Sequence, residues 1–190
     1  MKNKLLVISL LSIIIGCAGL PKPKQLYTAC NIWIYPRMHC INYKASSNFI
    51  PAGTEITLLK GLSCRRSICF KAAPTGNKIY NMQFNPHWHP GKTKNDYRKI
   101  FFTTKNFAEL TQGLTSREIK AIKQGLLVEG MSKKAVLISY GMPPEHRTPI
   151  LTSNVWIYWI NKIKQKKICF DENNKTIRCH KITIDRLKPL

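Results

Sequence analysis

The first fifteen residues constrain the rest of the chain most strongly, because they have the layout of an export signal. A short basic start at residues 1–4 precedes the apolar run of residues 5–15, which only Ser9 and Ser12 interrupt. This run is shorter than the ~20 apolar residues that a membrane-spanning helix needs, and its layout is typical of a secretory signal peptide. The folded part of the chain is therefore expected outside the cytoplasm, where disulfides persist.

The end of the apolar run, Ile14-Ile15-Gly16-Cys17, resembles the lipobox of bacterial lipoproteins. That resemblance implies removal of residues 1–16 and a covalent lipid on Cys17, whose three acyl chains exceed the two membrane signals usually needed for anchoring. Ala18 follows the cysteine where inner-membrane lipoproteins carry Asp, so the resemblance implies the periplasmic face of the outer membrane. Residues 17–28 then read as a tether. An ordinary signal peptide with a coincidental cysteine is the alternative.

The charge of the chain limits its partners. Its 190 residues include 31 Lys and Arg against 9 Asp and Glu, a formal net charge of +22. Nucleic acid is the usual partner of so basic a chain, but the export signal argues against it, so we expect no nucleic-acid partner. Anionic envelope ligands remain, namely peptidoglycan carboxylates, phospholipid and lipopolysaccharide phosphates. A lysine-rich composition that raises the charge without any ligand is the alternative.

Six further cysteines lie in the exported part and are disulfide candidates: Cys30, Cys40, Cys64, Cys69, Cys169 and Cys179. Four residues separate Cys64 from Cys69, so a tight turn at Arg66-Ser67 places them opposite each other across a hairpin. Cys30 and Cys40 are then the natural pair by proximity in the sequence. Six cysteines allow fifteen complete pairings, and spacing alone does not choose among them.

The hairpin at residues 168–179 makes its own cysteine pair harder to form. A two-residue turn at Asn173-Asn174 sends the thiols of Cys169 and Cys179 to opposite faces. A three-residue loop with Asn174 left-handed puts them on one face but diagonal, ~7–8 Å apart, which is too far for easy bridging. Pairing therefore requires a loop centred on Asn174, or a bulge.

The sequence carries no pattern that indicates catalysis or a metal. Its nine acidic residues are scattered, and no glycine-rich phosphate loop, His-Glu-x-x-His motif or nucleophile elbow occurs. The adjacent pairs His39-Cys40 and Cys179-His180 suggest zinc, but their spacing fits no closed structural motif. We therefore expect no enzyme, no metal and no cofactor beyond the lipid on Cys17.

The C-terminal half predicts two short helices followed by strands. Thr115 with Glu118 forms a capping box, and Ser132 caps the second helix. Gly125 and Gly141 suit the two helix ends. Strands are expected at residues 155–160, 167–171 and 175–184. Two helices on a three-stranded antiparallel sheet give an α+β fold.

These residues resemble the SmpA/OmlA (BamE) family, small lipoproteins of the outer-membrane β-barrel assembly machinery. The match consists of Gly130-Met131-Ser132 with Val136, then Tyr140-Gly141-Met142-Pro143, Trp156-Ile157-Tyr158 and Phe170, and it covers roughly residues 114–184. Tyr140 departs from the family's Leu. The resemblance implies a scaffold or adaptor role, and we expect the proline-stiffened loop of residues 140–148 to present Met142, His146 and Arg147 for docking.

The N-terminal half predicts a smaller β module. Short apolar runs alternate with turns, and the segments 31–33 and 50–59 resemble bacterial SH3-like domains, which implies a small barrel. The run Pro86-His87-Trp88-His89-Pro90 is expected to be a loop with a buried Trp88, and residues 92–99 a solvated loop.

The sequence thus predicts an α+β, lipid-anchored protein of two modules, an SH3-like barrel followed by two helices on a three-stranded sheet. The signal peptide spans residues 1–16, the lipidated tether 17–28, the SH3-like β module 29–108 and the BamE-like domain 109–190. The expected role is an outer-membrane-anchored scaffold or adaptor in an envelope protein complex, with other envelope proteins and the bilayer as partners. The alternative is a binder of anionic envelope ligands through a basic surface.

Overall fold

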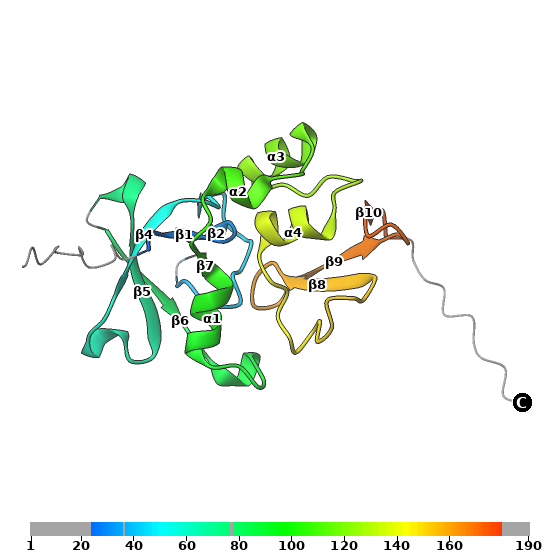
Figure 1. The fold of residues 1–190 in the computed structure, drawn as a ribbon. Coiled ribbons are helices and arrows are strands. Elements are labelled where there is room, and N and C mark those ends of the chain that lie inside the picture. The colour runs from blue at the N-terminus through cyan, green and yellow to red at the C-terminus, as the bar shows by residue number, and fades with distance from the viewer. Residues whose placement is uncertain (1–23, 36, 77, 180–190) are drawn as a thin grey trace, which may run out of the picture.

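The computed structural model describes residues 24–35, 37–76 and 78–179, which form a mixed α+β fold. Figure 1 shows the N-terminal half around one sheet and the C-terminal half around another, with helices between and above them. Cys17, the signal peptide, most of the tether and the end of the last expected strand lie outside the described residues. The tether is shorter than expected, because Leu26–Thr28 forms a paired strand of the N-terminal sheet.

A five-stranded antiparallel sheet organises the N-terminal half, in the order β6-β5-β4-β1-β7. Alternation of buried and exposed side chains along β6 places Tyr80 and Met82 in the core. No pairing closes β6 onto β7 within the described residues, so the sheet is open there. The strands span Leu26–Thr28 (β1), Glu55–Leu59 (β4), Ser67–Ala72 (β5), Ile79–Gln83 (β6) and Phe102–Thr103 (β7).

Shorter elements complete this half. The strands β2 (Ile32–Trp33) and β3 (Phe49–Ile50) form a two-stranded sheet, and short 3-10 turns occupy Leu62–Cys64, Ala73–Thr75 and Pro86–Trp88. The prediction of a solvated loop at residues 92–99 is wrong, because Lys94–Phe101 forms helix α1. Thr93 and Asp96 make a capping box, and Tyr97 and Phe101, four residues apart, bury one face.

The C-terminal half has the two predicted helices and the predicted three-stranded antiparallel sheet, with one further short helix at its start that was not predicted. Helices α2 (Phe107–Thr111), α3 (Ser116–Lys123) and α4 (Lys133–Tyr140) precede the antiparallel sheet β10-β9-β8. Thr115 and Ser132 cap α3 and α4 as expected. Gly141 ends α4 with a φ of 77°, and a Cβ there would lie 3.0 Å from the sulfur of Cys30, so only glycine fits. The strands span Val155–Trp159 (β8), Gln165–Phe170 (β9) and Thr176–Ile177 (β10).

The two halves share a core. Trp33 and Ala52 from the N-terminal half belong to the same hydrophobic cluster as Met131 and Trp156. Asn31 is fully buried and crosses the interface, because its amide group donates to the carbonyl of Ile122 in α3 at 2.8 Å. The expected boundary between residues 108 and 109 falls inside α2. The halves are therefore packed as one unit.

Candidate functional site

A loop that leaves β2 and returns beside β6 carries a cluster of aromatic and basic side chains. Asn42 has a φ of 57° and accepts a hydrogen bond from the backbone N–H of Trp33 at 2.9 Å, which folds the loop back. The N–H of Cys40 donates to the carbonyl of Gln83 at 2.9 Å. Because the neighbouring His39 bridges Gln83, this part of the loop is fixed along the edge of β6.

The first hollow at this loop has a volume of about 360 Å³. The ring centroid of Tyr43 lies 5.9 Å from that of Tyr35 and 5.7 Å from that of His39, so three rings line one wall. Arg37 and Lys162 supply the remaining lining. Lys162 comes from the connection between β8 and β9, so both halves of the chain contribute to the hollow.

A second hollow of about 280 Å³ adjoins the first, because His39 lines both. The ring of Trp88 lies 5.7 Å from that of His39. The other lining residues are Arg66, Ser67, Gln83, Phe84, Asn85 and Pro86. We call the two hollows together the aromatic-basic groove. No Asp or Glu of the described residues lines either of them.

The groove is electrostatically positive. Arg37, Arg66 and Lys162 are exposed, and among the described residues none of the three forms an ion pair. Burial lowers the pKa of His39, and the nearby charges of Lys162 and Arg37 lower it further, so the ring is neutral at pH 7. Neutral aromatic rings beside unpaired cations suit an anionic ligand that also has a face to stack.

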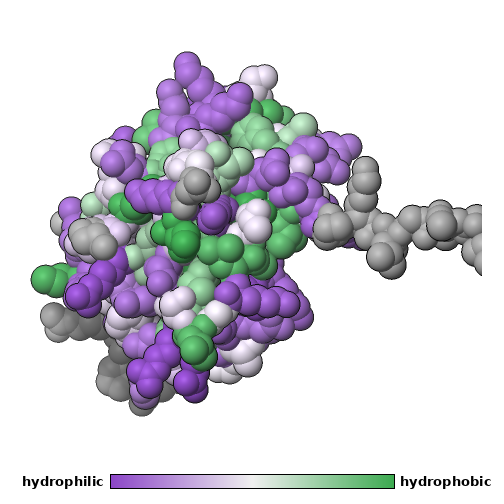
Figure 2. All heavy atoms as spheres, turned by 90° about the vertical axis from the view of Figure 1, so that its left-hand side faces the viewer, coloured by the Kyte–Doolittle hydropathy of each residue, from purple (hydrophilic) through white to green (hydrophobic). Residues whose placement is uncertain are grey.

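Most of the positively charged side chains of the described residues have no ion-pair partner. The one Lys or Arg ion pair among the described residues joins Lys175 to Glu118, with a nitrogen–oxygen distance of 3.7 Å. Figure 2 shows a mostly hydrophilic face around the five-stranded sheet, with smaller hydrophobic areas between. Lys133 and Lys134 at the start of α4 are bound internally, to the carbonyls of Thr152 and Gln112. They leave no evident anion site at that helix end.

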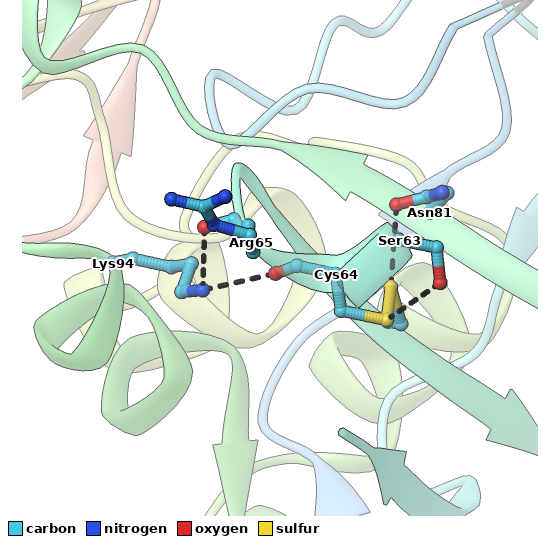
Figure 3. Close-up of a disulfide and its surroundings, with 6 residues drawn as sticks. Ser63, Cys64, Arg65, Asn81 and Lys94 are labelled. Carbon is cyan, nitrogen blue, oxygen red and sulfur yellow. Dashed lines mark hydrogen bonds between the residues drawn. A yellow bond between two sulfur atoms is a disulfide. The ribbon is translucent and has the colours of Figure 1, made fainter. Parts of the chain in front are cut away.

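The expected Cys64–Cys69 disulfide is present, with a Cα–Cα distance of 5.7 Å. Figure 3 shows it at the turn into β5, beside Lys94 of α1. The Lys94 ammonium group donates to the carbonyls of Cys64 at 3.0 Å and of Arg65 at 2.9 Å. The disulfide and the lysine together hold this turn against the helix.

The Cys169–Cys179 disulfide is also present, although the hairpin has the register that disfavours it. Cys169 pairs with Ile177 across the sheet, and Asn174 is left-handed with a φ of 57°, so Cys179 is diagonal to Cys169 in the ladder. Strand β10 ends at Ile177, however, so the ladder does not hold Cys179 in the diagonal position. The two Cα atoms therefore come within 5.3 Å without a change of register.

The expected pairing of Cys30 with Cys40 is wrong, because both thiols are free and buried. Cys30 packs against Gly141 of the C-terminal half, whereas the backbone of Cys40 is bound to the edge of β6. Burial raises the pKa of the Cys30 thiol to about 12, partly offset by Lys44, and burial also raises the pKa of Cys40. Neither thiol is a reactive nucleophile in the folded protein.

We predict two free thiols in the chain when Cys17 is replaced by serine. Unfolding this variant without reductant and titrating it with a thiol reagent should give two thiols per chain, because the structure pairs the other four cysteines. The folded protein should react far more slowly, since both free thiols are buried. A count of zero would mean that a third disulfide forms.

The three expected docking residues lie near one another but differ in exposure. The Nδ1 of His146 donates to the carbonyl of Trp88 at 2.9 Å, and its Nε2 accepts from the indole N–H of Trp159 at 3.0 Å. Arg147 is exposed, with its guanidinium group 5.2 Å from the Trp159 ring centroid. Met142 is half-buried in a separate hollow between the halves. Docking at this loop stays a prediction.

The loop at residues 86–90 buries His89 and not Trp88, so the prediction of a buried Trp88 is wrong. His89 is 1% exposed, whereas Trp88 is half-buried and lines the groove. Burial lowers the pKa of His89 to about 4, and the ring centroid lies 4.0 Å from that of Tyr97. The hydroxyl of Tyr97 donates to Glu145 at 2.9 Å, and this carboxylate lies 3.8 Å from the ring of His89. The cluster joins α1 to the loop of the C-terminal half.

Lys44 is buried at the interface between the two halves and directly follows Tyr43 of the groove in the sequence. The ammonium group of Lys44 lies 4.4 Å from the centroid of the Trp33 ring and 5.7 Å from that of Tyr158. It donates a hydrogen bond to the carbonyl of Asn42. Burial lowers its pKa to about 7, and Cys30 offsets part of that shift. The groove loop is thereby tied to both halves of the protein.

Sequence reasoning missed the groove, although part of its signal is local. Tyr35, Arg37, His39 and Tyr43 fall within nine residues of one another, a density of aromatic and basic side chains that could have been noticed. The contributions of Trp88 and Lys162 depend on tertiary packing.

Comparison with known proteins gives no further identification: no protein-family model, curated protein or solved structure matches the chain. Among the described residues, none of the helices has both the length and the apolar character required to cross a membrane.

Proposed function

We propose that the protein is an exported lipoprotein that binds an anionic ligand of the cell envelope in the aromatic-basic groove. The observation that carries this proposal is the groove itself. Arg37, Arg66 and Lys162 line it together with aromatic rings, and no carboxylate of the described residues does. Removal of residues 1–16 takes away Lys2 and Lys4, so the exported chain has 29 Lys and Arg against 9 Asp and Glu. This net charge of +20 adds a long-range attraction for anions.

Anchoring and location belong to the same proposal. The lipobox resemblance supports a lipid on Cys17 and attachment to the periplasmic face of the outer membrane. The short tether between Cys17 and β1 would then hold the groove near the bilayer. The open five-stranded sheet is compatible with an SH3-like module, and the helices on a three-stranded sheet are compatible with a BamE-like one.

The proposal predicts a charge-dependent interaction that maps to the groove. The full chain with Cys17→Ser, which lacks the anchor and so binds no bilayer through it, should co-sediment with peptidoglycan sacculi, lipopolysaccharide or phosphatidylglycerol vesicles. Arg37→Ala/Lys162→Ala should weaken the interaction at least about tenfold, because two cations that face the ligand are lost. Salt should weaken it as well.

A matched variant separates a site from general charge. Lys60→Ala/Lys120→Ala removes the same two charges from exposed positions outside the groove and should change the affinity by less than about twofold. Equal losses in the two double variants would remove the groove from the proposal. Absence of binding to all three probes at low salt would overturn the function.

A scaffold or adaptor role is the second candidate, and one observation favours it. The hollow that contains Met142 is lined by apolar side chains such as Leu137 and Ile138, and Ile150 nearby in the sequence is 62% exposed. Met142→Ala/Arg147→Ala should then weaken capture of envelope proteins in mild detergent while leaving the fold intact. Unchanged capture would remove this candidate.

A further inference from the structure

We propose that the ligand of the aromatic-basic groove is an acidic oligosaccharide, with sugar rings against Tyr35, His39 and Trp88 and its acidic groups beside Arg37 and Lys162. This inference rests on the proposed function and names the chemical class of the ligand.

The dimensions of the groove favour an extended ligand. The two hollows have volumes of about 360 and 280 Å³ and meet at His39. Together they fall in the range of ~300–1,000 Å³ that is usual for organic ligands. A small inorganic anion would leave most of this space to water, whereas a chain of several sugar rings would reach both hollows.

The aromatic side chains favour a ligand with flat, polarised C–H faces. His39 stands between Trp88 on one side and Tyr43 on the other, with centroid distances of 5.7 Å to each. Tyr35, His39 and Trp88 are only half-buried, so each ring retains exposed surface for a ligand. The C–H groups of a sugar ring pack well against the negative face of an aromatic ring.

The remaining lining argues against a lipid tail. Apart from Pro86, no aliphatic side chain of the described part of the chain lines either hollow. The polar lining consists of Ser67, Gln83 and Asn85, which suit the hydroxyl and amide groups of a sugar. An acyl chain would instead need a continuous apolar wall.

The positions of the cations favour acidic groups spaced along the ligand. Arg37 and Lys162 line the first hollow, and Arg66 lines the second. Each is exposed and has no carboxylate partner among the described residues. A guanidinium group binds a carboxylate or a phosphate through two parallel hydrogen bonds, so either acidic group fits.

Two sources of acidic saccharide are distinguished by direct titration of the full chain with Cys17→Ser. The probes are the peptidoglycan tetrasaccharide of alternating N-acetylglucosamine and N-acetylmuramic acid, the deacylated core oligosaccharide of lipopolysaccharide, and neutral chitotetraose. At least one acidic probe should bind about tenfold or more tightly than chitotetraose, because only the acidic probes engage the cations. The acidic probe that binds identifies the source.

Variants test the two parts of the site separately. Arg37→Ala/Lys162→Ala should abolish the preference for the acidic probe over chitotetraose, whereas Lys60→Ala/Lys120→Ala should keep it. Tyr35→Ala/Trp88→Ala should weaken binding about tenfold, and Tyr35→Phe/Trp88→Phe should retain it within about threefold, since the rings remain. Thermal melting of each variant checks that the fold is kept.

Phosphatidylglycerol vesicles and a single-stranded oligonucleotide complete the set, since both also present phosphates. If these bind through Arg37 and Lys162 and no saccharide does, the inference fails. If the vesicles are the probe that binds, the proposed function still stands. Equal affinity for acidic and neutral tetrasaccharides also overturns the inference. If no anionic probe binds, the inference and the proposed function fail together.

Discussion

Replacement of Asn31 by alanine should lower the free energy of unfolding by about 3 kcal/mol, one of the two largest effects that we expect from a single change. The Asn31 side chain accepts from the N–H of Ala52 at 2.8 Å and donates to the carbonyl of Ile122 at 2.8 Å, and the residue is fully buried. Alanine leaves the N–H of Ala52 buried without a partner, which costs about 1–3 kcal/mol. It also removes one of the two hydrogen bonds that the carbonyl of Ile122 accepts, the other coming from the N–H of Gly125 at 3.0 Å.

Chemical denaturation with the disulfides intact measures this change. Asn173→Ala is the matched control, because Asn173 is exposed in the β9–β10 turn and should change stability by no more than about 0.5 kcal/mol. Fluorescence and circular dichroism should report one shared transition, since Asn31 ties the two halves together. A loss below about 1 kcal/mol for Asn31→Ala would contradict the role assigned to its hydrogen bonds.

The second large effect is expected at Glu118, which joins α3 to α4. One carboxylate oxygen accepts from the N–H and hydroxyl of Thr115 at 2.9 and 3.0 Å, and the other accepts from the N–H of Ser132 at 2.7 Å. Glu118→Gln places an amide NH₂ group where one of these acceptors is needed. The free energy of unfolding at pH 7 should fall by about 2–3 kcal/mol.

The effect of Glu118→Gln should depend on pH. Burial by itself would raise the pKa of Glu118, but the hydrogen bonds from Ser132 and Thr115 outweigh it and lower the pKa from 4.5 to about 2. Because the folded-state pKa is depressed, the carboxylate stabilises the fold fully above pH 4.5, and this contribution disappears as the pH falls towards 2. The difference between wild type and variant should therefore shrink over that range.

Glu109→Gln is the control for Glu118→Gln. Glu109 completes the capping box of α2 through one hydrogen bond from the N–H of Asn106 at 2.7 Å, but it is exposed. We expect a loss below about 1 kcal/mol, because an exposed capping side chain exchanges its hydrogen bond with water. Similar losses for the two variants, or a pH-independent loss at Glu118, would contradict the assignment.

Local signals in the sequence were sufficient for helices α3 and α4 and the three-stranded sheet, but not for α2. The capping residues Thr115 and Ser132, the stop at Gly141 and the aromatic strand at residues 155–160 predicted the helices and the sheet, because each signal acts within a few residues. The Cys64–Cys69 disulfide followed from spacing in the same way.

Features that depend on packing between distant segments were not predictable. Helix α1 was not predicted, because its lysines and arginine favoured a solvated loop over the helix that the four-residue spacing of Tyr97 and Phe101 indicates. The free thiols of Cys30 and Cys40 reflect how the groove loop packs against β6 and Gly141. The groove needs Lys162 from the far end of the chain.

Nuclear magnetic resonance of the groove rings tests the central claim most directly. Addition of the tightest acidic saccharide to the full chain with Cys17→Ser should shift the imidazole signals of His39 and the indole N–H signal of Trp88 in a saturable way. The indole signal of Trp156, which is buried in the C-terminal core, should stay unchanged. Saturable shifts that omit His39 and Trp88, or no saturable shift at all, would contradict the assignment of this groove as the binding site.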